Sequence, residues 1–204
     1  MRLGVLGPAE GDLVSLGRAA EFMLDGARVT RAIYLGDDGA LDATVTAWAE
    51  RLVGADPTDD GAFKRAALLA THGTPEQLDR FIATEKARLR LRALESLPSG
   101  DGRTIEMLGL RVGIFVYDKG RLDEEDILSA NLIVYGKSPT PLIKQIGSRW
   151  FVTPGAVTCP TGGVAVIEDN DDDVVAEFFD AHGQLQLSEK LEMKQRTTTT
   201  VQGG

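Results

Sequence analysis

Histidine and cysteine, which build many catalytic metal and thiol sites, are scarce in this sequence. Its 204 residues include one cysteine, Cys159, and two histidines, His72 and His182. A single cysteine excludes a disulfide within the chain, which is typical of proteins in a reducing compartment. Because no histidine is positioned to activate Cys159, we expect it to be a small buried side chain and not a nucleophile.

Long apolar runs are also absent. None approaches the roughly 20 residues that a membrane-spanning helix requires. The chain does not start with a charged segment followed by a long apolar one, which is the pattern of a signal peptide. We therefore expect a cytoplasmic protein that does not bind a membrane.

Basic residues are also fewer than acidic ones. The chain has 22 lysines and arginines against 31 aspartates and glutamates, which gives a net charge of −9. Binding to a phosphate backbone requires a basic face, so we expect no nucleic-acid partner. Apolar residues make up 43% of the chain, which is enough to fill the core of a single domain.

The most informative segment spans residues 132–160. An apolar run over 132–135 predicts a buried strand, Gly136 ends it, and two prolines hold the loop 137–141 extended. A hairpin over 141–153 and a Pro-Gly turn follow. This order places loop residues at the end of a sheet, where proteins often carry binding or catalytic groups.

The rest of the pattern alternates strands with helices. A strand over 2–6, a helix over 13–24 and a strand over 29–35 predict a βαβ unit. The polar turns after its two strands should then share one edge of a parallel sheet. The remaining expected elements are helices over 40–53, 60–70, 74–94 and 122–128, and strands over 103–108, 110–116, 162–168 and 174–180.

This order of elements resembles the calcineurin-like metallophosphoesterases, in particular the small bacterial phosphodiesterases. The resemblance covers residues 1–55 and 100–180. It implies one domain over 1–186 with an α/β fold, a four-layer αββα sandwich of two mixed sheets flanked by helices. Residues from about 56 to 98 would be an inserted helical segment, and we expect the polar residues 187–204 to form a disordered tail.

The motifs that carry the resemblance keep their turns and lose most of their metal ligands. In the family, an Asp-x-His motif follows the first strand; here Pro8 and Glu10 stand at those ligand positions. The Gly-Asp motif survives as Gly36 and Asp37. The Gly-Asn-His/Cys-Asp motif has no counterpart, since the nearest segment, 53–56, lacks the asparagine.

The last two motifs have exchanged histidines for lysines. The family's His-Gly-His becomes Asp118 and Lys119 after a strand ending at Tyr117, and its Gly-His-Thr-His becomes Lys137 and Ser138 after Gly136. The resemblance thus defines a relic site, by which we mean Pro8, Glu10, Asp37, Asp38, Asp118, Lys119, Lys137 and Ser138.

The chemistry of two-metal sites decides how these changes are interpreted. A pair of divalent ions needs a shell of imidazoles and carboxylates, and of the usual ligands only Asp37 clearly remains. We predict that the dinuclear site does not form, that the chain has no catalytic residue and that it needs no cofactor. We further suppose that Asp37 pairs with one or both of Lys119 and Lys137; the alternative is that these lysines point to solvent.

Three functions follow from the resemblance. The leading one is a catalytically degenerate protein that binds an unknown protein partner or acts as a scaffold, as the retromer subunit of this fold does. The helical insertion, with its basic run Lys86, Arg88, Arg90 and Arg92, would make the contact, unless that run is only a solvated face. Trp150 and Tyr117 are second candidates, unless they belong to the core.

The other two functions use the relic site itself. One is a metal-dependent phosphodiesterase or phosphatase with a rebuilt site, in which Asp37 and Asp118, helped by Asp38 and Glu10, would hold one Mn²⁺ or Mg²⁺. The other is a phosphate-ligand binder that uses Lys119, Lys137 and Ser138.

Overall fold

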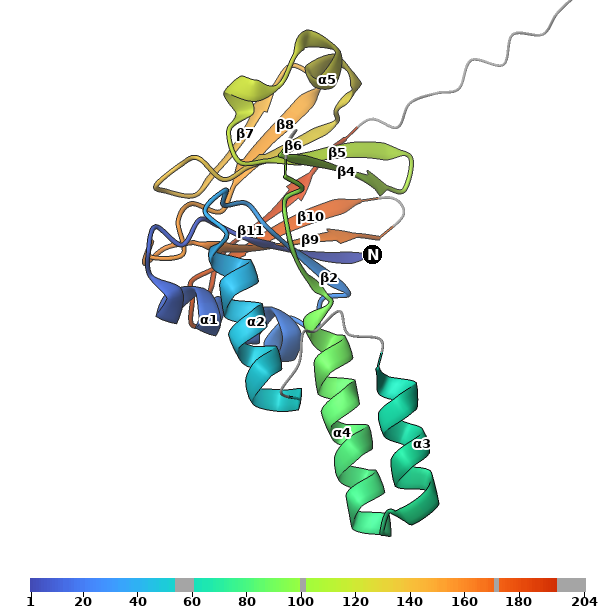
Figure 1. Cartoon of the computed structure of the whole chain (residues 1–204). Helices are drawn as coiled ribbons and strands as arrows, with labels where there is room; N and C mark the ends of the chain where they lie inside the picture. Colours follow the sequence, from blue (N-terminus) through green and yellow to red (C-terminus); the bar gives the residue numbers. More distant parts are fainter. Residues whose placement is uncertain (54–60, 100–101, 171–172, 194–204) are drawn as a thin grey trace, which may run out of the picture.

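The protein is a four-layer sandwich of two β-sheets with helices on both outer faces (Figure 1). The computed structural model describes residues 1–53, 61–99, 102–170 and 173–193. The expected four-layer α/β fold is confirmed. No helix of the described residues is long and apolar enough to cross a membrane.

The first sheet has six strands, and β1 is one of its two central strands. Its order is β11 (Leu185–Leu191), β10 (Val174–Phe179), β9 (Val164–Asp169), β1 (Arg2–Leu6), β2 (Arg31–Tyr34) and β3 (Leu94–Ser96). β1 pairs in parallel with β2 and antiparallel with β9, so the backbone of both of its edges is hydrogen-bonded. The predicted βαβ unit is therefore present.

The second sheet has five strands. Its order is β4 (Arg103–Leu108), β5 (Arg111–Val116), β6 (Leu132–Tyr135), β8 (Arg149–Thr153) and β7 (Leu142–Ile146). The three middle strands are parallel, whereas the two edge strands pair antiparallel. The carboxyl ends of β5, β6 and β8 thus lie at one edge of this sheet.

Three hydrophobic clusters hold the four layers together. Between the sheets, Val5 and Ile33 of the first sheet share a cluster with Phe115 and Val134 of the second. The outer face of the first sheet packs against helices α1 (Leu13–Glu21), α2 (Ala40–Val53) and α4 (Pro75–Leu91). The outer face of the second packs against α5 (Glu124–Ser129). A π-turn over Phe22–Gly26 extends α1, and a 3-10 turn over Lys119–Arg121 precedes α5.

The segment expected to be a helical insertion contains a hairpin of α3 (Ala62–His72) and α4, which projects from the body of the protein (Figure 1), and also strand β3 of the first sheet. The predicted capping box at the start of α4 is present: the Thr74 hydroxyl accepts from the Gln77 N–H, and the Gln77 side chain accepts from the Thr74 N–H. Residues 54–60, including the nearest counterpart of the missing motif, lie outside the described residues.

The expected helix over 74–94 was too long. α4 ends at Leu91, and residues 94–96 form strand β3, which pairs in parallel with β2. Leu94 is buried in the cluster beneath the helices. The strand has only three residues, which is too short for a period of two to stand out from the helical pattern before it.

The prediction of a disordered tail from residue 187 is wrong for residues 187–191. They belong to β11, which pairs antiparallel with β10. Leu191 and Met193 are buried between the sheets, and the indole N–H of Trp150 donates to the carbonyl of Glu192. β11 is a largely exposed edge strand, so its composition is polar although its backbone is paired. Residues 194–204 lie outside the described residues.

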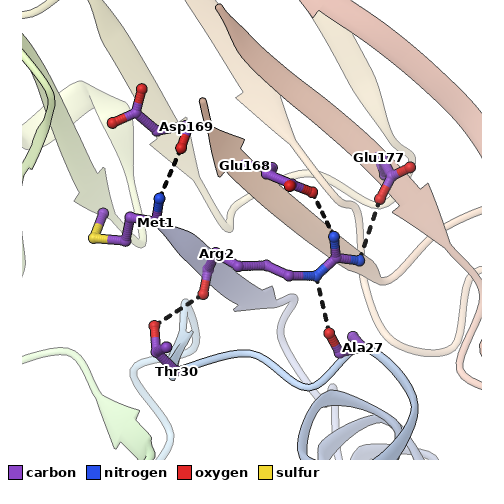
Figure 2. Close-up of polar contacts among 7 residues, drawn as sticks. All are labelled: Met1, Arg2, Ala27, Thr30, Glu168, Asp169 and Glu177. Carbon is purple, nitrogen blue, oxygen red and sulfur yellow. Dashed lines mark hydrogen bonds and ion pairs between the residues drawn. The ribbon is translucent and has the colours of Figure 1, made fainter. Parts of the chain in front are cut away.

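At the amino end of β1, Arg2 ties several segments together (Figure 2). Its guanidinium donates to the Ala27 carbonyl at 2.9 Å and to the carboxylates of Glu168 and Glu177 on the neighbouring strands. The terminal amine of Met1 donates to the carbonyl of Asp169 at 2.7 Å. These bonds hold the amino end of β1 in place. The relic site lies at the opposite, carboxyl end of the strand, so these bonds do not contribute to it directly.

Candidate functional site

The turns that follow β1, β6 and β8 meet at one edge of the sandwich. The N–H of Gly7 donates to the Gly163 carbonyl at 2.8 Å, and the N–H of Val157 donates to the Pro8 carbonyl at 3.0 Å. The N–H of Lys137 donates to the Tyr117 carbonyl at 2.7 Å. The expectation that polar turns gather at one edge is confirmed.

Two glycines let these turns approach closely. A Cβ on Gly7 would lie 1.8 Å from the carbonyl oxygen of Gly155, and a Cβ on Gly136 would lie 2.3 Å from the carbonyl oxygen of Leu35. Both contacts are with backbone, which cannot rotate away as a side chain can. Gly7, which precedes the first family motif, and Gly136, which opens the last one, are therefore both needed here for packing.

Asp118 and Lys137 form the best-defined ion pair of the relic site. The Lys137 ammonium lies 2.6 Å from Asp118 Oδ2, and the N–H of Gly120 donates to the other carboxylate oxygen at 2.9 Å. The hydrogen bond from Lys137, with that from Gly120, lowers the pKa of Asp118. The same bond raises the pKa of Lys137. Lys137 is largely exposed, so this pair contributes little to stability.

The predicted pairing of Asp37 with a lysine is wrong. Among the described residues, its ion-pair partner is Arg121, whose Nη2 lies 3.5 Å from Asp37 Oδ2. Lys137 binds Asp118 instead, and the Lys119 ammonium lies 4.3 Å from the ring centroid of Tyr135, a cation–π contact. The 3-10 turn over Lys119–Arg121 carries Arg121 back toward β2, which strand-end spacing alone does not reveal.

Asp38 is held by a tyrosine that the sequence analysis did not single out. The hydroxyl of Tyr34 donates to Asp38 Oδ1 at 2.9 Å and accepts from the N–H of Ala9 at 2.9 Å. Asp38 also accepts from the N–H of Ala40 at the start of α2. Tyr34 is fully buried, and this burial raises the pKa of its hydroxyl. A tyrosine at the end of a buried apolar strand needs a hydrogen-bond partner for its hydroxyl. In the sequence, this requirement is the feature that could have identified Tyr34.

Tyr34→Phe should lower the free energy of unfolding by about 1–3 kcal/mol, because it leaves the buried N–H of Ala9 without its acceptor. Urea unfolding followed by circular dichroism measures the change. Tyr117→Phe is the matched control: the Tyr117 side chain is half-buried, and we expect a change within about 0.5 kcal/mol. Equal effects of the two substitutions would contradict the bridging function of Tyr34.

The other residues of the relic site do not converge on Asp37. Pro8 is buried, Glu10 is exposed in the left-handed conformation with φ of 51°, and the hydroxyl of Ser138 donates to the Thr140 carbonyl of its own loop. His72 and His182 are both exposed and lie outside this edge, in α3 and in the turn before β11. Cys159 is half-buried, with its sulfur 3.5 Å from the Thr161 hydroxyl.

The donor set does not fit a dinuclear metal centre. Within the described residues, no three histidine, cysteine, aspartate or glutamate side chains are placed so that they could hold one ion together. The two carboxylates proposed as ligands, Asp37 and Asp118, each face a different cation. The absence of bound metal in solution stays a prediction.

A polar cavity of about 490 Å³ opens beside Asp37. It lies at the carboxyl ends of β2, β3 and β5. Asp37, Asp42, Tyr117 and Arg121 contribute its functional groups, and the Ser96 hydroxyl on its wall donates to Asp42 at 2.7 Å. Among the described residues that line the cavity, two carboxylates face one guanidinium, so the charge of the cavity does not favour an anion.

Comparisons with known proteins find likeness in structure only. No family model matches the sequence, and no curated protein matches it. A conserved uncharacterised protein from Streptococcus pneumoniae, described as a predicted phosphoesterase, superposes with a TM-score of 0.53 at 15% identity, covering 93% of this chain and 95% of that one. Vacuolar protein sorting 29 from Cryptosporidium parvum superposes with a TM-score of 0.50 at 11% identity, covering 93% and 96%.

Proposed function

We propose that this chain, which has the fold of the calcineurin-like metallophosphoesterases, is a catalytically degenerate form that acts as a protein-binding module. The observation that carries the proposal is the state of the strand-end edge. Asp37 pairs with Arg121 and Asp118 with Lys137, and no ligand group of three forms among the described residues.

Electrostatics supports this proposal. Lys119, Arg121 and Lys137 bring three positive charges to the turns where the family holds its two dications. A divalent ion placed there would be repelled by these cations and would have to displace them from Asp37 and Asp118. Asp37 and Asp118 are thus paired with side-chain cations, which weakens the attraction of these two carboxylates for a metal ion.

The candidate contact surface is the helical hairpin, although its basic run does not form one docking face. Arg88 is buried, and Arg90 pairs with Asp25 and with the Leu24 carbonyl, both on the π-helical extension of α1. Of the second candidates, Trp150 is buried between the sheets and belongs to the core, and Tyr117 is half-buried. The exposed apolar residues of α3 are better anchors.

Mn²⁺ or Mg²⁺ should leave the melting temperature of the protein unchanged. A specific ion at 100 times its dissociation constant would add about 2.7 kcal/mol to the free energy of unfolding, and a melt would resolve that easily. Protein purified without chelator should contain less than one-tenth of an equivalent of metal. Stoichiometric metal and a rise in melting temperature, both abolished by Asp37→Ala with Asp118→Ala, would support the rebuilt phosphodiesterase.

Inorganic phosphate in the same melt tests the third function. We expect no protection, because Lys119 and Lys137 are already engaged with Tyr135 and Asp118. Protection by phosphate that Lys137→Ala abolishes would favour the phosphate-binding alternative over a protein-binding module.

A further inference from the structure

Strand β4 is an edge of the second sheet, and its backbone is paired on one side only. Among the described residues, β5 is the one strand that pairs with β4. Figure 1 shows the second sheet at the end of the molecule opposite to α3 and α4, so the projecting hairpin does not cover this edge. An edge strand presents unpaired N–H and C=O groups, which are a template for pairing with a further strand.

Of the four sheet edges in the described part of the chain, β4 is the one without protection. β3 has only three residues, and β11 shifts its register against β10 and carries the exposed Lys190. β7 follows Pro141 and carries the exposed Lys144. Short strands, irregular pairing, prolines and lysines are the usual means by which proteins prevent edge-to-edge pairing. β4 has six residues in unbroken register with β5, and it contains neither lysine nor proline.

The hydrogen-bond pattern of β5 identifies which backbone groups of β4 face the free edge. Val112 lies opposite Met107, and its N–H and carbonyl both bond to Asn131, on the side of β5 away from β4. Bonded and unbonded pairs alternate along an antiparallel ladder. The N–H and C=O groups of Met107, and with them those of Ile105 and Arg103, therefore point to the free edge.

The side chains of β4 suit a contact with another strand. On the outer face of the sheet, Ile105 and Met107 are 56% and 57% exposed. The two charged residues of the strand are already paired within the chain: Arg103 with Asp126, and Glu106 with Arg31. A further strand at this edge would therefore bury apolar surface and would leave no charge without its partner.

We propose that β4 pairs antiparallel with β4 of a second copy of this chain, so that the two second sheets join into one. A two-fold axis passes through Ile105, and each Ile105 lies opposite its counterpart in the other copy. In this register Arg103 of each copy lies opposite Met107 of the other. Three pairs of residues then exchange two hydrogen bonds each, six in all, which satisfies every outward backbone group of both strands.

The sequence of β4 is complementary to itself in this register. Thr104 lies opposite Glu106 of the other copy, and its hydroxyl can donate to that carboxylate. Ile105 and Met107 of the two copies form one apolar row across the joined sheet, within the diagonal reach of their side chains. An axis at Glu106 would set two carboxylates side by side, and an axis at Thr104 would place Met107 beyond the end of the other strand. This self-complementarity identifies a second copy as the occupant of the edge.

Charge favours the antiparallel direction. The first turn of α5 is acidic and lies beside the amino end of β4, because Arg103 pairs there with Asp126. Antiparallel pairing sets the acidic turns of the two copies at opposite ends of the joined strands. A parallel pairing would bring them side by side, where like charges repel each other.

Sedimentation equilibrium of the full chain tests the proposal. One strand from each copy buries less than the about 800 Å² per partner of a standard interface, so we expect a dimer with a dissociation constant of roughly tens of micromolar. Ile105→Lys should weaken dimerisation at least tenfold, because two ammonium groups would meet at the axis. The matched control is Ile146→Lys, since Ile146 is 53% exposed on β7, the other edge strand of the same sheet. A single-chain mass of the wild type at about 500 µM, or equal effects of the two substitutions, would overturn the proposal.

Ile105→Pro separates the backbone pairing from the apolar contact. Because the N–H of Ile105 faces the free edge, proline removes it without breaking a bond to β5. Ile105→Ala loses the side chain but keeps the N–H. We expect Ile105→Ala to weaken dimerisation and Ile105→Pro to abolish it. Equal dimerisation of the two variants would contradict pairing through the backbone.

A disulfide tests the register. Opposite residues of a hydrogen-bonded antiparallel pair have Cα atoms about 5.5 Å apart, a distance that a disulfide can span. In a Cys159→Ser background, Ile105→Cys should give a covalent dimer with oxidised glutathione as the oxidant. Ile146→Cys is the control and should react much more slowly. Equal rates of covalent dimer formation would overturn the pairing at Ile105.

This inference goes beyond the proposed function, because β4 contains no residue of the relic site. Metal binding with hydrolysis would overturn the proposed function and would leave the mass measured by sedimentation unchanged. A monomeric wild type without metal would overturn the pairing of β4 alone. Circular dichroism of each variant establishes that it is folded before its mass is interpreted.

Discussion

Gly7→Ala is expected to lower the free energy of unfolding by about 3 kcal/mol or more. A Cβ at this position would lie 1.8 Å from the carbonyl oxygen of Gly155, so the turns after β1 and β8 would have to separate. Overpacking of this kind costs about 1–3 kcal/mol when a side chain can yield, and more when the contact is with backbone. The N–H of Gly7 would also be pulled from the carbonyl of Gly163.

The matched control is Gly17→Ala, the same substitution within helix α1. Its Cβ would lie 3.6 Å from Cζ2 of Trp48, an ordinary contact, and alanine is favoured over glycine in a helix by about 0.5–1 kcal/mol. We therefore expect Gly17→Ala to stabilise the protein slightly. Urea unfolding measures both variants. A Gly7→Ala protein of wild-type stability would show that the strand-end turns are not in rigid contact.

The strongly patterned elements are predictable from sequence. β6, with its four apolar residues, and α2 have the predicted bounds. The glycine turns also point correctly to one edge of the sandwich, because a parallel βαβ unit brings the carboxyl ends of its strands together. These features depend on neighbouring residues in the chain, which a single sequence displays directly.

Features that depend on distant residues were missed. β11 is polar because it is an exposed edge strand, and only its pairing with β10 makes it ordered. For Asp37, the sequence predicts a lysine at a former ligand position as the partner. In the structure the partner is Arg121, which reaches Asp37 through a turn whose direction is set by tertiary packing. Strand-end spacing identifies which residues gather at an edge, and it does not identify how they pair.

Glu85→Gln is expected to destabilise the protein by about 1.5–3 kcal/mol, because it removes the charged acceptor of hydrogen bonds from the buried guanidinium of Arg88 and from Arg65. The Arg88 side chain is 2% exposed and donates from Nε to Glu85 Oε2 at 2.9 Å. Arg65 donates to the other carboxylate oxygen at 2.9 Å. Glu50→Gln, on the exposed face of α2, is the isosteric control and should stay within about 0.5 kcal/mol of the wild type. Thermal and urea unfolding report both.

The pH dependence of the difference identifies its origin. Burial acts to raise the pKa of Glu85, but the hydrogen bonds from Arg88 and Arg65 outweigh it and leave this pKa below its ordinary value. A carboxyl whose pKa is lowered by folding stabilises the protein above its unfolded pKa and loses that contribution as the pH falls through the folded one. The gap between wild type and Glu85→Gln should be constant near pH 7 and shrink below about pH 4.3. A gap independent of pH would indicate a loss of packing instead.

Replacing both Glu85 and Arg88 tests how much of the destabilisation comes from the buried charge that the single variant leaves behind. Glu85→Leu with Arg88→Met removes the buried charges together, and such replacements are often neutral or stabilising because the desolvation cost disappears. We expect the double variant to unfold between Glu85→Gln and the wild type, because Arg65 still loses its bond to Glu85. Arg65 and Glu85 lie on different helices of the hairpin, so their pairing also sets how α3 lies along α4.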